Sequence, residues 1–157
     1  MKKTLVAYFS ASGVTGSVAR TLSDALKADL YEIAPAVRYT DADLDWRNAA
    51  SRSSLEMKDK SSRPEIVDTP VNIADFDTIL VGFPIWWYVA PTIVNTFLEK
   101  HDFSGKKLIL FATSGGSGFG KTVDSLKGSV PGAVIEEGML QRGKQDLNAW
   151  ETWAKGL

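Results

Sequence analysis

The sequence predicts an α/β protein in which helices cover both faces of a parallel β-sheet. Three short runs, residues 4–9, 78–83 and 107–112, are mostly apolar and rich in valine, isoleucine, leucine and phenylalanine. Strands that are buried on both faces of a parallel sheet have this composition. Helical patterns lie between the runs, and strands that alternate with helices form parallel sheets with right-handed crossovers.

Two further segments predict strands nearer the edges of the sheet. Residues 29–33 alternate polar and apolar side chains, and residues 133–135 form a shorter apolar run. Alternation indicates a strand with one solvated face. The expected sheet therefore has five strands.

Four helices are predicted from apolar residues that recur at helical spacing. Pro91 suits the first turn of the second helix, because an N–H group has no partner there. Gly128 is placed to end the third helix. The apolar faces are formed by Val18, Leu22, Ala25 and Leu26; by Val94, Phe97 and Leu98; by Val123 and Leu126; and by Leu147, Trp150 and Ala154.

The long connection between the second and third strands is polar and poorly periodic, apart from one possible helix start. Thr40 and Asp43 form a candidate capping box, and Tyr39 and Leu44 occupy the flanking positions of a hydrophobic staple. Residues 51–64 contain six charged residues and five serines. We expect that segment to be a mobile excursion on the surface.

The length of 157 residues, with 44% hydrophobic and 24% charged residues, predicts a single domain over residues 1–157. The absence of cysteine excludes disulfides and thiolate metal sites, and with one histidine we expect no metal site. The formal net charge of −1, without a dense basic run, indicates that nucleic acid is not a partner.

The sequence also indicates where the protein is found. No apolar run approaches the roughly 20 residues that a membrane helix needs. The basic start, residues 1–3, precedes only six apolar residues, which is too short a run for a signal peptide. We therefore expect a cytoplasmic protein with no membrane segment.

The segment Ser10-Ala11-Ser12-Gly13-Val14-Thr15 lies between the first strand and the first helix. Small hydroxyl residues and one glycine let the backbone approach an anion closely. The following helix directs free N–H groups and its positive dipole end towards that anion. The pattern favours a phosphate site, although serine and glycine also form ordinary strand-to-helix turns.

A second loop follows the strand at residues 78–83 and is bracketed by prolines. Trp86, Trp87 and Tyr88 are consecutive aromatic residues, which cannot all enter one core. Their faces can stack on a planar ligand, which contributes about 1 kcal/mol beyond area burial. The alternative is that one tryptophan packs under the loop while the other covers a helix or a partner chain.

A third loop, residues 113–120, has four glycines in its last six residues and exposes backbone N–H and C=O groups. Residues Gly115–Thr122 also match the phosphate-binding Walker A pattern, between a strand and a helix. A nucleoside triphosphatase needs an acidic residue at the end of another buried strand to hold magnesium, and these strands have none. A P-loop nucleotide-binding protein is therefore a remote alternative.

Together these loops resemble those of the flavodoxin family, whose first loop has the pattern hydroxyl-x-hydroxyl-Gly-x-Thr and binds the phosphate of FMN. The resemblance covers essentially the whole chain. It implies a three-layer sandwich with a five-stranded parallel sheet of order 2-1-3-4-5, an arrangement for which flavodoxin is a standard example. It also implies that FMN contacts Ser10, Ser12, Gly13, Val14, Thr15, Pro84, Ile85, Trp86, Trp87, Thr113, Ser114, Gly115, Gly116 and Gly118.

By this resemblance the first loop surrounds the phosphate, residues 84–87 line one side of the isoalloxazine ring, and residues 113–118 contact its other edge. The first loop has no lysine or arginine, which implies a neutral cradle of hydroxyl and N–H groups. FMN would carry the electron or hydride chemistry while the protein orients the ring. No side chain is assigned as a catalytic acid or base.

The resemblance implies an FMN-binding redox protein, but two features differ from the electron-carrier pattern. The carriers are strongly acidic, whereas this chain is near neutral and lacks a field that steers it to basic partners. Residues 83–92 also lack the glycine that carriers commonly have after the third strand. Both favour the alternative of an NAD(P)H-dependent reductase of a small acceptor such as a quinone. A carrier would instead need a redox partner protein, and the oligomeric state stays open.

Overall fold

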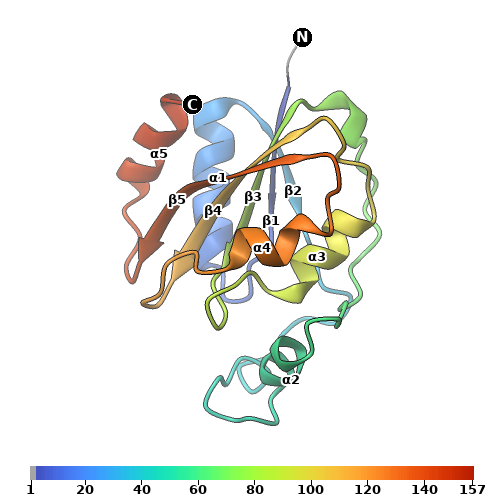
Figure 1. Cartoon of the computed structure of the whole chain (residues 1–157). Helices are drawn as coiled ribbons and strands as arrows, with labels where there is room; N and C mark the ends of the chain where they lie inside the picture. Colours follow the sequence, from blue (N-terminus) through green and yellow to red (C-terminus); the bar gives the residue numbers. More distant parts are fainter. Residues whose placement is uncertain (1–2) are drawn as a thin grey trace.

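The structure, a computed structural model, describes residues 3–157 as a five-stranded parallel sheet between two helical layers (Figure 1). The strand order is β2-β1-β3-β4-β5, and all neighbouring pairs are parallel, which confirms the predicted architecture. Residues 1–2, part of the segment weighed as a signal peptide, lie outside the described residues. The elements are β1 (Thr4–Tyr8), α1 (Val14–Leu26), β2 (Asp29–Glu32), α2 (Arg52–Lys58), η1 (Ile73–Asp75), β3 (Thr78–Pro84), α3 (Thr92–Glu99), β4 (Lys107–Ser114), α4 (Thr122–Lys127), β5 (Val134–Arg142) and α5 (Leu147–Lys155).

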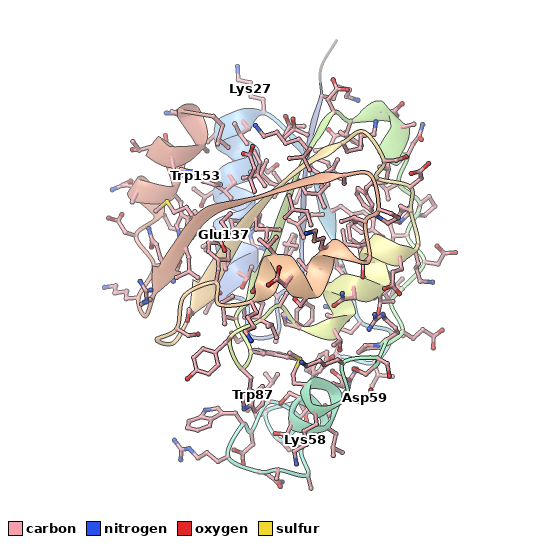
Figure 2. The ribbon with its side chains drawn as sticks, in the orientation of Figure 1. Lys27, Lys58, Asp59, Trp87, Glu137 and Trp153 are labelled. Carbon is pink, nitrogen blue, oxygen red and sulfur yellow. The ribbon has the colours of Figure 1, made fainter. Side chains whose placement is uncertain are left out.

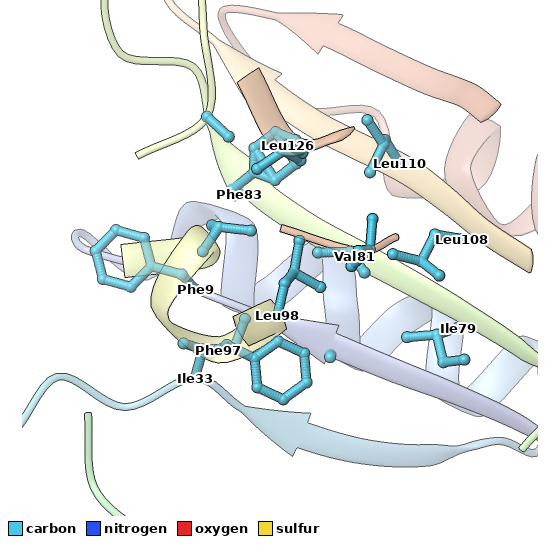
Figure 3. Close-up of a cluster of buried hydrophobic side chains, with 14 of the residues drawn as sticks. Phe9, Ile33, Ile79, Val81, Phe83, Phe97, Leu98, Leu108, Leu110 and Leu126 are labelled. Carbon is cyan, nitrogen blue, oxygen red and sulfur yellow. The ribbon is translucent and has the colours of Figure 1, made fainter. Parts of the chain in front are cut away.

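Two clusters of buried apolar side chains form the core, one on each face of the sheet. The larger cluster packs the central strands against α3 and α4, through residues such as Val81 and Phe97 (Figure 3). The other cluster packs the opposite face against α1 and α5, through Leu22 and Trp150. The predicted helical faces are the ones that pack inwards, except that Leu147 at the start of α5 is 40% exposed.

Both predicted helix boundaries are close to those observed. Pro91 is the N-cap of α3, one residue before the first helical residue. Gly128 is the C-cap of α4, as expected. Each boundary was predictable because proline and glycine act on the local backbone.

The strand β5 is longer than the predicted run at residues 133–135 and extends from Val134 to Arg142. Glu136 and Glu137 interrupt its apolar pattern, and both are exposed on this edge strand. A Cβ on Gly138 would lie 2.5 Å from the Leu110 carbonyl oxygen and 2.6 Å from the Trp153 ring. The strand is therefore defined by close packing with β4 and α5 rather than by its own pattern.

The connection between β2 and β3 forms a lobe, residues 35–67, beyond the carboxyl edge of the sheet (Figure 1). We call it the α2 lobe; an antiparallel bridge between Pro35 and Ile66 closes its base. The predicted capping box is present, since the Thr40 N–H donates to Asp43 Oδ2 (2.9 Å) and the Asp43 N–H donates to Thr40 Oγ1 (3.1 Å). It closes a turn and no helix follows, so the predicted helix start is wrong.

The helix of this lobe is α2, which lies inside the segment that was expected to be a surface excursion. Its N-cap is Ser51, whose side chain accepts a hydrogen bond from the Ser54 N–H. Ser51, Ser53 and Ser54 are all buried. The segment therefore contains a capped helix with buried serines within a lobe that extends beyond the sheet, and its mobility stays a prediction.

No helix within residues 3–157 combines the length and the apolar composition needed to cross a bilayer.

Candidate functional site at the carboxyl edge of the sheet

Three loops leave the carboxyl ends of β1, β3 and β4, which are neighbours in the sheet. We call them loop 1 (residues 10–15), loop 3 (residues 84–91) and loop 4 (residues 113–121). Parallel strands end at the same edge, and ligands of open α/β sheets bind beyond that edge. The fold therefore brings together the three loops that the sequence analysis singled out.

Thr113 joins the three loops. Its hydroxyl lies 2.8 Å from the hydroxyl of Thr15 in loop 1, and both residues are buried. Its carbonyl oxygen accepts a hydrogen bond from the N–H of Ile85 in loop 3 (2.9 Å). A buried hydroxyl is costly without a partner, so this junction fixes the position of loop 1 relative to loops 3 and 4.

Loop 1 presents unpaired N–H groups at the start of α1. Gly13 is the N-cap, with φ 93°, and a Cβ there would meet no atom within 4 Å. Its N–H donates to Ser10 Oγ (3.1 Å), and the Ser17 N–H donates to the Gly13 carbonyl (3.1 Å). The amides of residues 14–16 precede this bond and have no partner within the helix. With the exposed side chain of Ser12, they form a set of donors for an anion, although Thr15 and Gly16 are themselves buried.

A positive charge lies beside these donors. Arg20 leans towards the start of α1, and its Nη1 atom is 3.5 Å from the position of a Cβ on Gly16. Burial raises the pKa of the nearby Tyr8 hydroxyl, and the carboxylate of Glu32 raises it further, whereas Arg20 lowers it. The surroundings of loop 1 are therefore not wholly neutral. Arg20 was not predicted as a site residue, because it lies in α1 and outside the loop that carries the sequence pattern.

Loop 3 folds into a tight turn with two residues in the left-handed region. Trp86 and Val89 form an antiparallel bridge, with N–H to carbonyl distances of 2.9 and 3.2 Å. Between them, Trp87 has φ 49° and Tyr88 has φ 68°. Such turns normally use asparagine or glycine, because other residues cost about 1–3 kcal/mol each in this region. Strain of this kind clusters at ligand sites, and here it determines the position of two aromatic side chains.

The two tryptophans of loop 3 have different environments. Trp86 is partly buried and makes edge-to-face contacts with Phe9 and Tyr39, each with ring centroids 5.6 Å apart. Trp87 is 44% exposed and lies on the side of the sheet where the α2 lobe is found (Figure 2). One tryptophan therefore packs under the loop, and the other is accessible to a ligand.

Loop 4 leaves open space along its backbone. A Cβ on Gly115 or on Gly116 would meet no atom within 4 Å. Ser114 is buried, and its hydroxyl accepts a hydrogen bond from the Gly116 N–H (3.1 Å). At Gly118 the space is limited by Arg142, whose Nη2 atom would lie 3.3 Å from an added Cβ. The first two glycines therefore let a planar ligand approach the backbone.

The Walker-like part of loop 4 lacks the geometry of a phosphate loop. The N–H of Lys121 donates to the Tyr88 carbonyl (3.2 Å), and the N–H of Thr122 donates to the Phe119 carbonyl (3.0 Å). The Thr122 hydroxyl also donates to the Phe119 carbonyl (2.6 Å). Thr122 is 0% exposed, so its hydroxyl is not available to magnesium. These bonds remove the basis for the P-loop alternative.

Tyr39 connects the α2 lobe to the site, although its sequence context indicated only a helix signal. Its ring packs against Phe9 and Trp86, and its hydroxyl donates to Glu56 Oε1 on α2 (2.5 Å). Burial and this hydrogen bond raise the pKa of Tyr39 far above its usual range. Tyr39 therefore stays a neutral phenol and holds the lobe against loop 3.

Other hollows of the surface lie away from the three loops. One of about 470 Å³ is lined by Leu5, Asp29, Tyr31 and Asn72, among others, near the amino ends of β1 and β2. Another, of about 540 Å³, lies between α1 and α5. Within residues 3–157, histidine and carboxylate side chains form no group of three or more that could hold a metal ion. The three loops therefore remain the candidate site.

The comparisons with known proteins agree with this open, parallel α/β fold. The sequence profile of the flavodoxin family matches residues 3–156, and the chain therefore belongs to the flavodoxin family. No curated protein sequence matches the chain.

Several solved structures are similar to this chain. One is a provisionally assigned flavoprotein from Bacteroides eggerthii DSM 20697, with 48% identity, a TM-score of 0.88, and coverage of 98% of this chain and 96% of that chain. Another, also provisionally assigned, is from Bacteroides uniformis ATCC 8492, with 47% identity, a TM-score of 0.90 and coverage of 98% of both chains. A flavoprotein from Lactobacillus acidophilus NCFM, solved in complex with FMN, shares the fold at 22% identity and a TM-score of 0.69, over 96% of this chain and 99% of that chain.

Proposed function

We propose that the protein binds FMN across loops 1, 3 and 4 and uses it in redox reactions. The observation that carries this proposal is the Thr113 junction, which holds a helix start rich in donors, an exposed tryptophan and an open glycine loop together. Membership of the flavodoxin family and the FMN complex of the Lactobacillus acidophilus flavoprotein support the proposal.

In this proposal loop 1 binds the phosphate. Ser10 and Ser12 supply hydroxyl groups, the amides of residues 14–16 supply N–H donors, and Arg20 adds positive charge from the side. Thr15 contributes its N–H, because its hydroxyl is already paired with Thr113. The positive φ at Gly13 lets the chain enter the helix while leaving the donors open.

Loops 3 and 4 hold the ring system. Trp87 offers an exposed indole face for stacking, while Trp86 supports the turn from below through its contacts with Phe9 and Tyr39. Pro84, the last residue of β3, and Ile85, which follows it, contact the ring in this proposal. The residues of loop 4 that face the ring edge in this arrangement are Thr113, Ser114, Gly115, Gly116 and Gly118.

Bound FMN supplies reversible uptake of electrons or hydride. Loops 1, 3 and 4 contain no aspartate, glutamate or histidine, so in this proposal they bind and orient the ring without a carboxylate or imidazole that could act as an acid or a base. The indole of Trp87 and the loop 4 backbone exclude water from the parts of the ring that they cover. The protein therefore acts by positioning, and solvent supplies any further proton.

The charge of the protein favours a small acceptor over a protein partner. A formal net charge of −1 gives little electrostatic steering towards a basic redox protein. We therefore infer an NAD(P)H-dependent reductase of a small molecule such as a quinone. An electron carrier that serves a redox partner protein is the second candidate, supported by membership of the flavodoxin family.

FMN titration into the purified protein tests the binding step. We expect quenched flavin fluorescence with one FMN per chain, and an about fivefold to tenfold weaker affinity for Trp87→Ala. Trp46→Ala is the matched control, because Trp46 is another exposed tryptophan and belongs to the α2 lobe rather than to the three loops. A protein that leaves flavin fluorescence unchanged would refute FMN binding.

A turnover assay separates the two candidate functions. The FMN-loaded protein, NADPH or NADH, and a soluble quinone are combined without any other protein. Oxidation of the nicotinamide at a rate that depends on the quinone supports the reductase. Turnover that appears only after a flavodoxin reductase is added supports the carrier.

A further inference from the structure

Arg142, the last residue of β5, turns its side chain onto loop 4. Its Nε–H donates to the Gly116 carbonyl (3.1 Å), and its Nη2 atom would lie 3.3 Å from a Cβ on Gly118. The next residue strengthens this contact, since the Gly143 N–H donates to the Ser114 carbonyl (2.8 Å). The guanidinium therefore lies across the glycine-rich part of loop 4.

The charge of Arg142 is not neutralised by a carboxylate. The arginines at positions 38, 52 and 63 each form an ion pair with a glutamate. Arg142 forms no ion pair within residues 3–157, although its side chain is exposed. The carboxylate of Asp146, four residues further on, caps α5 by accepting a hydrogen bond from the Ala149 N–H. A positive charge therefore stays unpaired beside loop 4.

We propose that Arg142 orders loop 4 and stabilises the reduced form of the flavin, an inference that rests on the FMN binding proposed above. One hydride carries two electrons and one proton, so its transfer from a reduced nicotinamide makes the flavin one charge more negative and leaves the nicotinamide oxidised. A positive charge beside the ring favours the more negative form. Arg142 thereby adapts the site to accept hydride.

Arginine serves both roles because of its shape. The planar guanidinium directs several N–H groups in fixed directions, so one can bind the Gly116 carbonyl while the charge extends towards Gly118. A lysine at this position keeps the charge without this fixed fork. The two roles are therefore separable by substitution.

The experiment compares Arg142→Gln and Arg142→Lys with Lys144→Gln in the FMN-loaded protein. Lys144→Gln removes the same charge from an exposed residue two positions away and outside loop 4. The two-electron reduction potential of the bound flavin is measured by equilibration with a reference dye, and the affinity for oxidised FMN by fluorescence quenching. Thermal unfolding of each apoprotein checks that it is folded.

We expect Arg142→Gln to lower the affinity for reduced FMN about tenfold relative to oxidised FMN, which lowers the potential by about 30 mV for two electrons. Arg142→Lys should retain most of the potential, and Lys144→Gln should leave it unchanged. Equal potentials for Arg142→Gln and Lys144→Gln would overturn the inference, even if oxidised FMN binds less tightly. Failure of the unsubstituted protein to bind FMN would instead refute the proposed function.

Discussion

Loop 1 and loop 4 look alike in sequence but differ in the state of their backbone amides. Both place serine, glycine and a threonine between a buried strand and a helix, and loop 4 matches the phosphate pattern more closely. At the start of α1 the amides have no partner within the helix, whereas those of Lys121 and Thr122 are bonded to Tyr88 and Phe119. A phosphate loop is thus defined by free N–H groups, which a sequence pattern does not report.

The largest effect is expected from Gly120→Ala, which breaks the contact between loop 4 and loop 3. Gly120 has φ 54°, and a Cβ would lie 2.3 Å from the Tyr88 carbonyl oxygen. Backbone strain and displacement of the loop 3 turn should destabilise the protein by about 2–4 kcal/mol. Urea unfolding measures the change. Gly115→Ala is the control, because its Cβ meets no atom within 4 Å, and equal stabilities would contradict the prediction.

A smaller effect is expected from Thr15→Val, which removes the hydrogen bond between loop 1 and loop 4. The substitution leaves the buried Thr113 hydroxyl without its 2.8 Å partner and should cost about 1–2 kcal/mol. FMN affinity should also fall, because the two loops are no longer fixed to each other. The double variant with Thr113→Val should be less destabilised than the sum of the single variants, as urea unfolding can show. Additive losses would argue against the junction.

Gly13→Ala tests whether the open helix start of loop 1 matters for binding. At φ 93° an alanine costs about 1 kcal/mol, although its Cβ has free space. We expect FMN affinity, measured by fluorescence quenching, to fall about fivefold as the loop relaxes from this conformation. Gly105→Ala is a matched control with φ 75°, free space and a position outside the three loops. It should lose similar stability and keep its FMN affinity; equal losses of affinity would contradict a role for loop 1.

The smallest effect is expected from Lys121→Ala in the Walker-like part of loop 4. Its backbone N–H, and not its side chain, makes the contact with Tyr88, so FMN affinity should stay within about twofold. Calorimetric titration with magnesium–ATP should give no binding heat for the unsubstituted protein or for this variant. ATP binding that disappears in Lys121→Ala would restore the P-loop interpretation.

The sheet was largely predictable, because its central strands carry their own signal. Residues such as Val81 and Leu110 belong to apolar runs whose composition reflects burial on both faces. The second half of β5 and the helix α2 were not predictable in this way. Gly138 packs against β4 and α5, and the serines of α2 are buried by the surrounding lobe, so their environment depends on distant parts of the chain.

The candidate site was predictable as three loops but not as an arrangement of atoms. The alternation of the five strands with α1, α3, α4 and α5 and the composition of each loop followed from the sequence alone, because apolar periodicity and turn residues act locally. Only the tertiary structure decided that Trp86 is packed while Trp87 is exposed, and that Arg142 lies across loop 4. It also decided which amides are free, because the Lys121 N–H donates to the Tyr88 carbonyl of another loop, and the two loops meet only when the sheet forms.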